Sequence, residues 1–282
     1  MLKLIECPRD AMQGWETFIP TETKIQYLNK LLQVGFDTLD FGSFVSPKAI
    51  PQMQDTAEVL GKLDLSNTQT KLLAIVANMQ GAEQAINFPE IKYLGYPLSI
   101  SETFQQKNTN KSITESLELV ASLQEICSQH NKILVVYISM AFGNPYNDLY
   151  NREVVEEFTQ RLVNLGVQII SLADTVGVAE VKDITFLFET LIARFPTIEF
   201  GAHLHASPDK AQNKLAAAYQ AGCRRFDGAL RGFGGCPMAT DHLIGNMPTE
   251  LMTAFFKGAG EDLKLDEACL QDALEAVNSV FI

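Results

Sequence analysis

The chain has 282 residues, of which 46% are hydrophobic and 20% are charged, and its formal net charge is −12. These proportions are typical of a soluble, well-packed globular protein, and a balance this acidic argues against nucleic acid as the main partner, because phosphate binding needs a cationic face. No apolar run approaches the ~20 residues that a membrane-spanning helix requires, so we expect no membrane partner.

The beginning of the sequence and its cysteines bear on the compartment. The first residues, Met-Leu-Lys-Leu-Ile-Glu-Cys, lack the long apolar stretch of a signal peptide. The five cysteines are odd in number and scattered along the chain, which fits a reducing compartment. We therefore expect a cytoplasmic protein.

Eight short segments rich in apolar and β-branched residues recur along the chain and predict strands. They are residues 2–7, 38–44, 71–78, 91–100, 133–140, 168–175, 198–206 and 224–230. Between them, apolar residues recur with helical spacing, for example over residues 25–32, 113–126 and 154–165. Gly35 and Gly166 stand just before the next strand, as expected of left-handed helix ends.

The repeated strand and helix predict an α/β fold. Strands that are apolar almost throughout favour a parallel sheet covered on both faces, and eight strand–helix units in about 230 residues match a (β/α)8 TIM barrel. A doubly wound open sheet is the alternative, but no Gly-x-Gly-x-x-Gly follows the first strand. We expect one catalytic domain over residues 1–282, with the barrel at about 2–247 and additional C-terminal helices at about 248–282.

Polar residues stand at the predicted carboxyl ends of the strands, which is where barrel enzymes place their chemistry. In chain order they are Arg9, Asp10, Gln13, Asp40, Ser43, Lys48, Asn78, Ser139, Asp174, Thr175, His203, His205, Cys236 and Asn246. A barrel interior normally prefers branched apolar side chains. The convergence of polar residues on one rim therefore predicts an active site.

His203 and His205 are the most informative of these residues. Residues two apart on a strand point to the same side, so both imidazoles would face the barrel axis as metal ligands. With Asp10, and with Asn246 as a further donor, they form a nitrogen and oxygen set that suits Mg2+ or Mn2+, whereas Zn2+ usually recruits a thiolate or a third imidazole. The alternative interpretation is two unrelated histidines that are hydrogen-bonded within a polar rim.

Arg9 and Cys236 extend this set. The planar fork of donors on Arg9 suits a carboxylate or a developing enolate oxygen; the alternative is a salt bridge to Asp40, and both can hold together. Cys236 lies in a Gly-Gly-Cys-Pro segment whose glycines let the backbone move or approach a ligand closely. It is a candidate acid or base, with a small buried hydrophobic residue as the alternative.

These motifs, in this order, resemble the 3-hydroxy-3-methylglutaryl-CoA (HMG-CoA) lyase family, which belongs to a wider group of metal-dependent carbon–carbon lyases and Claisen-type synthases. The matching stretches are Pro8-Arg9-Asp10-x-x-Gln13, Ser43-Phe44-Val45-Ser46-Pro47-Lys48 with Pro51-Gln52-Met53, Ser171-Leu172-x-Asp174-Thr175-x-Gly177-Val178, His203-x-His205, and Gly234-Gly235-Cys236-Pro237 with Gly245-Asn246. The Ser-Phe-Val-Ser-Pro-Lys and Gly-Gly-Cys-Pro stretches are typical of the lyase branch.

The resemblance implies roles for these residues. The implied metal ligands are Asp10, His203, His205 and Asn246, and the residues expected to contact substrate are Gln13, Ser43, Lys48, Asn78, Ser139 and Thr175. Arg9 would stabilise an enolate, Cys236 would be the acid or base, and His203 or Asp174 would take the proton of the tertiary hydroxyl. The implied reaction is a retro-Claisen cleavage of HMG-CoA to acetoacetate and acetyl-CoA, as in leucine and ketone-body metabolism. A homodimer is also implied.

Four positions depart from the family pattern. Ala11 replaces a glycine, Asn144 replaces a cysteine, and Asp40 replaces a glutamate that is longer by one methylene. Ala206 replaces an aspartate whose loss removes a carboxylate able to orient a ligand histidine, a change that typically costs roughly 10–100-fold in metal affinity or activity. Two alternatives stay open: a Claisen-type synthase acting on a 2-oxo acid, and a non-catalytic homologue that binds metal and acyl-CoA. Lys48 and residues 108–111 are candidates for holding the CoA.

Overall fold

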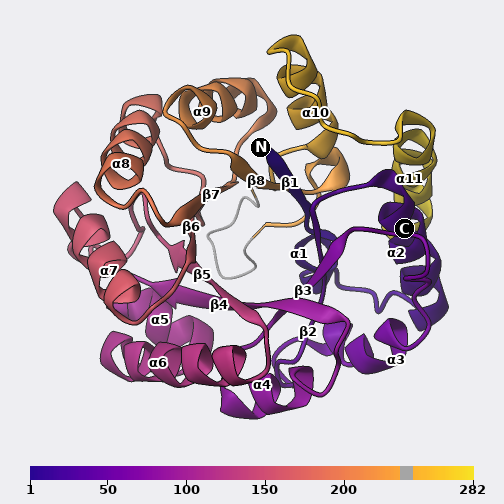
Figure 1. Cartoon of the computed structure of the whole chain (residues 1–282), viewed down its shortest axis with the longest axis horizontal. Coiled ribbons are helices and arrows are strands. Elements are labelled where there is room, and N and C mark those ends of the chain that lie inside the picture. The colour runs from indigo at the N-terminus through magenta and orange to yellow at the C-terminus, as the bar shows by residue number, and fades with distance from the viewer. Residues whose placement is uncertain (236–243) are drawn as a thin grey trace.

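All eight segments predicted as strands form strands, and they pair side by side into a closed barrel (Figure 1). The computed structural model describes residues 1–235 and 244–282. The strands are β1 (Lys3–Glu6), β2 (Thr38–Ser43), β3 (Lys71–Ile75), β4 (Ile91–Ser99), β5 (Ile133–Ser139), β6 (Ile169–Asp174), β7 (Glu199–Leu204) and β8 (Arg225–Gly228). Every neighbouring pair is parallel, and β8 pairs back with β1. The (β/α)8 barrel is therefore confirmed, and the open-sheet alternative is wrong.

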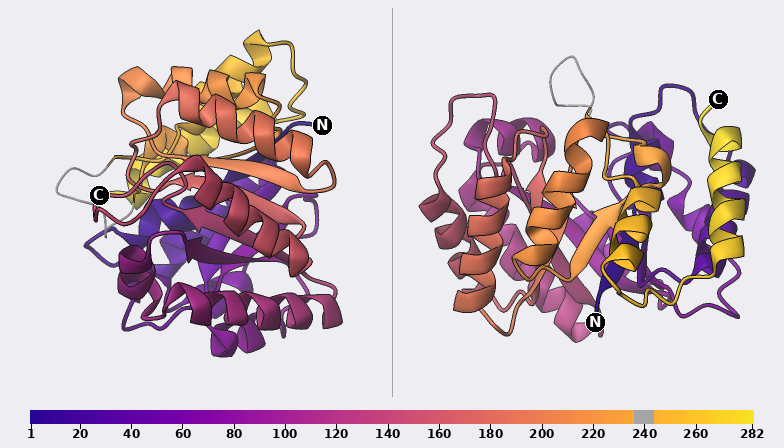
Figure 2. Two further views of the ribbon diagram at one scale, coloured as in Figure 1. Left: turned by 90° about the vertical axis from the view of Figure 1, so that its left-hand side faces the viewer. Right: turned by 90° about the horizontal axis from the view of Figure 1, so that it is seen from above.

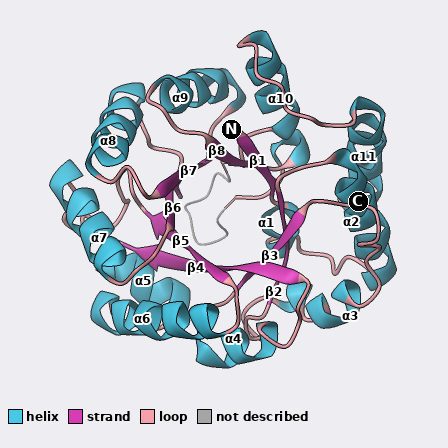
Figure 3. Ribbon diagram, viewed as in Figure 1, coloured by secondary structure: helices cyan, strands magenta, loops and turns pink. Residues whose placement is uncertain are grey.

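The helices form a ring outside the barrel (Figure 3). They are α1 (Pro8–Gln13), α2 (Thr21–Val34), α3 (Thr56–Leu60), α4 (Met79–Ala85), α5 (Glu102–Thr109), α6 (Ile113–Gln129), α7 (Arg152–Asn164), α8 (Val181–Arg194), α9 (Pro208–Gln220), α10 (Thr249–Gly258) and α11 (Glu267–Val280). The predicted apolar stripe of α2, Ile25, Leu28, Leu31 and Leu32, is buried against the barrel. Gly35 ends this helix with φ 90° and so turns the chain into β2.

The first strand is shorter than predicted, and this changes the setting of the first motif. β1 ends at Glu6, and Pro8 begins α1, because proline suits the first helical position, whose N–H has no partner within the helix. Arg9, Asp10 and Gln13 therefore lie on a helix, not on a strand end. Residues three and four apart share one face of a helix, so Gln13 lies beside both Arg9 and Asp10.

Among the residues described, two α-helices follow β8, in agreement with the additional C-terminal helices predicted. α10 takes the place of the eighth barrel helix, and α11 lies beyond it and packs against α2 (Figure 1). The backbone N–H of Asp266 donates to the carbonyl of Val34 at 2.9 Å, which fixes the start of α11 beside the end of α2. Figure 2 shows the N-terminus and the C-terminus at opposite ends of the barrel. Within the described residues, no helix has the length and apolar character needed to span a bilayer.

The interior of the barrel is divided between apolar and polar sides. Strands β3 to β6 contribute an apolar cluster of Leu73, Ile75, Tyr93, Val135, Tyr137 and Ile169. Strands β2 and β8 contribute buried charged residues, among them Asp40, Arg225 and Asp227. Buried charges are costly unless they are paired or bind a ligand, so the polar side is the part of the barrel that needs a functional explanation.

Glu6 joins the two ends of the barrel sequence at the seam between β1 and β8. Its Oε1 accepts from the backbone N–H of Leu230 at 2.9 Å, and its Oε2 accepts from the hydroxyl of Thr249 at 2.5 Å. The side chain is fully buried, and burial raises its pKa to about 8, although the two hydrogen bonds oppose this. Glu6 is therefore protonated in the folded protein at pH values where it ionises in the unfolded chain.

We expect Glu6→Gln to flatten the dependence of stability on pH. A raised folded-state pKa makes the contribution of Glu6 fully favourable below pH 4.5 and lost as the pH rises to about 8. The free energy of unfolding of the wild type should therefore fall relative to Glu6→Gln by more than about 1 kcal/mol between pH 5 and pH 8. Urea denaturation across this range measures it. Glu118→Gln, on the exposed face of α6, is the control, and a difference independent of pH would contradict the assignment.

Candidate metal centre and active site

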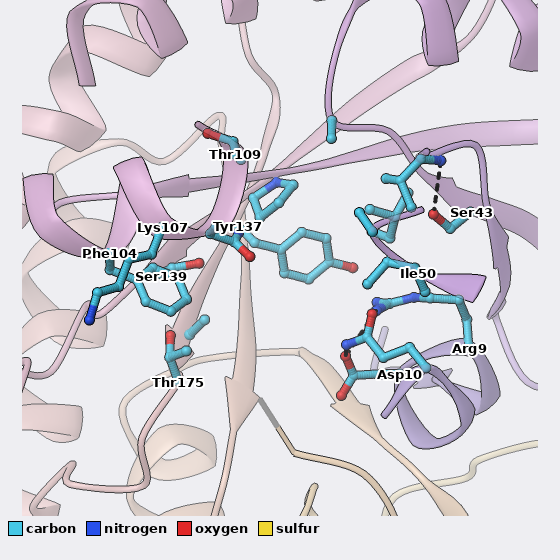
Figure 4. A pocket seen from close by; sticks show the side chains of 18 of the residues that line it. Arg9, Asp10, Ser43, Ile50, Phe104, Lys107, Thr109, Tyr137, Ser139 and Thr175 are labelled. Atoms are coloured by element: carbon cyan, nitrogen blue, oxygen red, sulfur yellow. Dashed lines mark hydrogen bonds and ion pairs between the residues drawn. The ribbon is translucent and has the colours of Figure 1, made fainter. Parts of the chain in front are cut away.

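A cavity of about 590 Å³ opens at the carboxyl ends of the strands (Figure 4). The predicted site residues that line it are Arg9, Asp10, Gln13, Ser43, Asn78, Ser139, Thr175, His203 and His205. They come from helix α1 and from the ends of five strands, so barrel closure brings together residues far apart in the sequence. The cavity is also lined by residues 107–111 at the end of α5.

Asp10, His203 and His205 meet at one point in this cavity. One ligand atom from each lies within 4.8 Å of the others, and the two imidazole rings have centroids 5.2 Å apart. All three contributing residues lie in the buried part of the site. One carboxylate and two imidazoles at this spacing form a donor set for a divalent cation.

The bonding of His205 leaves a free ligand atom. Its Nδ1 lies 3.2 Å from the carbonyl oxygen of Thr175, and because a carbonyl only accepts, Nδ1 carries the hydrogen. The other ring nitrogen, Nε2, is buried and has no hydrogen-bond partner within residues 1–235 and 244–282. Burial and the neighbouring His203 lower the pKa of His205 to about 4. A neutral imidazole with a buried, unpaired Nε2 lone pair fits a metal ligand.

His203 is held by a carboxylate that the sequence analysis did not find. Its Nδ1 lies 3.1 Å from Oδ2 of Asp227, on the neighbouring strand β8. Burial lowers the pKa of His203, but the bond and charge of Asp227 outweigh this, and the net shift is upward. The replacement of the family's aspartate by Ala206 removes one carboxylate able to orient a ligand histidine. Asp227 is a carboxylate that orients His203. The signal for it was a single aspartate inside a predicted buried strand.

A second group of possible ligands, Cys7, His203 and Asp227, also lies within 4.8 Å. Cys7 is fully buried, and burial together with nearby carboxylates raises its pKa well above the usual value. A thiol in this state does not supply the thiolate that binds metals. The group containing Asp10 is therefore the better candidate metal site.

Asn246 lies directly beside Asp10. Its amide nitrogen Nδ2 donates to Oδ2 of Asp10 at 2.7 Å and to the carbonyl oxygen of Phe233 at 2.9 Å. A short antiparallel bridge also pairs Asn246 with His205. These contacts place the Oδ1 of Asn246 as the donor atom that this residue would offer to the same cation.

Arg9 forms the predicted salt bridge and also borders the cavity. Its Nε lies 3.1 and 3.2 Å from the two carboxylate oxygens of Asp40, and its Nη2 lies 2.5 Å from Oδ2 of Asp40. Its Nη1 donates to Oδ1 of Asp10 and to Oε1 of Gln13, each at 2.9 Å. The shorter side chain of Asp40 therefore does reach Arg9. The described part of the chain engages four of the five N–H groups of Arg9, which leaves one on Nη2 for a ligand.

The buried charges around Arg9 favour a cation. Burial alone would raise the pKa of Asp10, but Arg9 and the two histidines lower it to about 2. Burial raises the pKa of Asp40 to about 6 in spite of Arg9. Three carboxylates, those of Asp10, Asp40 and Asp227, lie in this region with two guanidiniums, those of Arg9 and Arg225. The excess negative charge is what a bound divalent cation would balance.

Tyr137 is a further cavity residue that the sequence analysis missed. Its ring meets the ring of His203 edge to face with centroids 5.6 Å apart, and Figure 4 shows its hydroxyl pointing toward Arg9. Burial raises its pKa well above the usual value, and the hydroxyl has no hydrogen-bond partner among the described residues. Tyr137 is thus a neutral O–H donor facing the cavity. It precedes Ser139 by two residues, so strand alternation was the available signal.

Some predicted residues do not join this group. Lys48 is exposed and does not line the cavity, and Cys236 lies outside the described residues. Asp174 is buried below the rim, where its Oδ2 accepts from Lys214 at 2.5 Å and its Oδ1 accepts from the N–H of Ala179 at 3.1 Å.

Lys214 is the partner that fixes Asp174. Its ammonium also donates to the carbonyl oxygens of Gly177 and His205, each at 2.9 Å, so it joins α9 to the ends of β6 and β7. The sequence carried a signal for it. Lys214 stands in the apolar stripe of α9, between Ala211 and Ala218, where a lysine must be paired.

Comparison with known proteins places these features in a wider context. The HMGL-like family model matches residues 3–277. The chain is 35% identical to hydroxymethylglutaryl-CoA lyase YngG of Bacillus subtilis over 243 residues, 86% of this chain and 80% of that protein. It is 28% identical to (R)-citramalyl-CoA lyase of Chloroflexus aurantiacus over 272 residues, 93% and 85% of the two chains.

A solved structure extends the similarity to three dimensions. An HMG-CoA lyase from Acinetobacter baumannii, in complex with coenzyme A and 3-methylmalate, superposes with a TM-score of 0.91 at 28% identity, over 100% of this chain and 91% of that one.

We expect Lys214→Met to lower the free energy of unfolding by about 3 kcal/mol, because it leaves a buried carboxylate without its partner. Adding Asp174→Asn should recover part of this loss, since the remaining group is then uncharged. Lys210→Met, at an exposed position of the same helix, should change stability by less than about 0.5 kcal/mol. Urea denaturation measures all four proteins, and equal effects of the two lysine substitutions would contradict a structural ion pair.

Proposed function

The chain belongs to the HMGL-like family and is an enzyme, a carbon–carbon lyase of the HMG-CoA lyase type, and from this premise we propose that it cleaves HMG-CoA to acetoacetate and acetyl-CoA with a divalent cation. The observation that carries the proposal is the meeting of Asp10, His203 and His205 beside Arg9 in one cavity. One relative is a citramalyl-CoA lyase. The choice of HMG-CoA as the acyl-CoA substrate is therefore itself proposed.

The metal ligands we propose are Asp10, His203, His205 and Asn246. The buried, unpaired Nε2 of His205 and the excess of carboxylates support this choice. A bound Mg2+ or Mn2+ supplies Lewis-acid polarisation of the substrate oxygens. The protein fixes the orientation and tautomer of the ligand histidines: Asp227 does so for His203, and the carbonyl of Thr175 does so for His205.

The proton of the substrate hydroxyl passes to His203. Of the two bases that the sequence leaves open, His203 lines the cavity, whereas Asp174 is occupied by Lys214 and by a backbone N–H. Asp227 engages the Nδ1 of His203, so Nε2 is the nitrogen left to accept the proton. Because one nitrogen cannot hold a proton and a cation together, His203 acts as the base in this step, and Asp10, His205 and Asn246 would hold the cation. The proton's departure lets the C2–C3 bond break in the retro-Claisen sense, and acetoacetate leaves with the new carbonyl group.

Arg9 stabilises the second product while it is an enolate. Its free N–H on Nη2 and its fixed charge lie at the cavity, held by Asp40 on the opposite side. Tyr137 adds a neutral O–H donor nearby. A proton returned to C2 completes acetyl-CoA and balances the one removed from the hydroxyl. Cys236, outside the described residues, stays the predicted donor of that proton.

The acyl-CoA enters past the end of α5. Lys107, Asn108, Thr109, Asn110 and Lys111 line the mouth of the cavity and supply cations and amides for the CoA arm. Lys107 lies over the ring of Tyr146, with its ammonium 4.4 Å from the ring centroid, so its charge is held near the mouth. Lys48 does not line the cavity, which favours residues 108–111 between the two candidates. The homodimer and the cytoplasmic location stay predictions.

Release of acetoacetate from HMG-CoA tests the proposal directly. Purified protein with Mn2+ or Mg2+ should release it, and excess EDTA should abolish the release. Arg9→Ala should lose turnover by several orders of magnitude while still binding Mn2+, which controls for contaminating lyase activity. Pyruvate release from citramalyl-CoA is measured in parallel. Cleavage of citramalyl-CoA alone would overturn the proposed substrate, and no cleavage of either by Mn2+-loaded protein would overturn the proposed reaction.

Asp227→Ala tests the support of His203. We expect a loss of roughly 10–100-fold in Mn2+ affinity, because the imidazole loses the carboxylate that fixes its tautomer. Asp227→Asn, whose amide oxygen can still accept from Nδ1, should lose less. Isothermal titration with Mn2+ measures both, and wild-type affinity in Asp227→Ala would show that Asp227 does not support a ligand.

A further inference from the structure

An aromatic cluster lies next to the proposed metal site and has no role in the reaction as described. It consists of Trp15, which follows α1, Phe233, which follows β8, and Phe281, which follows α11. The rings of Phe233 and Phe281 stack with centroids 4.4 Å apart and planes 9° apart. The ring of Trp15 meets Phe281 edge to face at 5.3 Å and Phe233 at 6.2 Å.

The segment that carries Phe233 is in direct contact with two of the proposed ligands. The carbonyl oxygen of Phe233 accepts from the amide of Asn246 at 2.9 Å, and the same amide donates to Asp10. The next residue, Gly234, has φ 95° and packs so closely that an added Cβ would lie 2.7 Å from the Nδ2 of Asn246 and 2.8 Å from the carbonyl oxygen of Asp10. The position of this segment therefore sets the position of Asn246.

The same segment contains two consecutive residues with a left-handed backbone. Arg231 has φ 59° and is followed by Gly232 at φ 67°, and a left-handed conformation is unfavourable for arginine. Such residues persist where the surroundings hold them. Here three contacts do so. Oε2 of Glu250 on α10 accepts from the backbone N–H of Arg231 at 3.0 Å, the carbonyl oxygen of Leu274 on α11 accepts from the Arg231 guanidinium at 3.4 Å, and Phe281, directly after α11, stacks on Phe233.

We propose that Phe281 is a positioning residue for the metal site. Its ring holds the segment 231–235 in place, the carbonyl of Phe233 then holds the side chain of Asn246 against Asp10, and Trp15 ties the same cluster to the end of α1, which carries Asp10. The proposal rests on the metal site of the proposed function. It assigns to α11, outside the eight strand–helix units, a part in ordering that site.

Mn2+ affinity, measured by electron paramagnetic resonance on the whole protein, tests this proposal. We expect Phe281→Ala to raise the Kd for Mn2+ about tenfold, the scale typical of lost support for a metal ligand. Phe281→Tyr retains the stacked ring and should keep wild-type affinity. Phe281→Leu keeps most of the side-chain volume without the ring, and its Kd for Mn2+ should lie between those of the other two variants. If Phe281→Ala does not fold, wild-type affinity in Phe281→Leu would contradict the proposal.

A matched control separates positioning from general loosening of the fold. Phe255 on α10 is also half-buried, and its ring packs against Tyr219 and Phe256. Among the described residues, its aromatic partners do not include Phe233. Phe255→Ala should leave Mn2+ affinity unchanged. An equal loss in Phe255→Ala and Phe281→Ala would overturn the proposal.

The single tryptophan of the chain reports on the cluster itself. Selective excitation of Trp15 should show emission shifted to longer wavelength in Phe281→Ala, because the indole loses a covering ring. A shift in Trp15 emission with wild-type Mn2+ affinity would overturn the proposal. Absence of Mn2+ binding by the wild type would instead overturn the metal site of the proposed function, so the two failures are distinguishable.

Discussion

The pairing of β8 with β1 is the constraint on which the site depends. The two strands meet in register from Lys3 opposite Arg225 to Glu6 opposite Gly228, and Glu6 reinforces this seam through Leu230 and Thr249. Only because the sheet closes here does Asp10, which follows β1, lie beside Asn246, which follows β8. The direct pairing of β7 with β8 sets Asp227 opposite His203, and closure brings these two residues to Asp10. An open sheet with the same strands would separate Asp10 from Asn246 and from the two histidines.

Closure has an electrostatic consequence as well as a geometric one. It gathers three carboxylates and two guanidiniums into a region with little water, where unbalanced charge is costly. The resulting pKa shifts run in opposite directions for neighbouring carboxyl groups: that of Asp10 falls to about 2 and that of Asp40 rises to about 6. The ionised Asp10 is the group best suited to a cation. The pair of Arg9 and Asp40 leaves a positive donor at the cavity wall for a substrate oxygen.

Much of this arrangement could be predicted from the sequence, and what could not has physical causes. The strands were predictable because their apolar runs are short and regularly spaced, and His203 and His205 because strand alternation fixes their common direction. The helix α1 was not, because a six-residue helix leaves no periodic pattern and Pro8 reads equally well as a turn. Asp227 and Tyr137 were missed because the role of a polar residue within a strand depends on its contacts with residues of other strands. The sequence alone does not show these contacts. Asp174 was predicted at the rim, but it is buried and paired with Lys214. Lys214 comes from a helix, so no strand-based argument reaches this partner.

The contact between Asp10 and Asn246 spans 236 positions of the chain, and this fixes the order in which the site can be assembled. A nascent chain emerges with Asp10 first, the two histidines much later and Asn246 after the last strand, so no partial barrel contains all four proposed ligands. Metal capture by this proposed set would therefore be coupled to the final closing step of folding. A cation that binds only the closed form stabilises it by mass action. Binding of the cation would therefore stabilise the closed barrel after its strands have paired in the correct register.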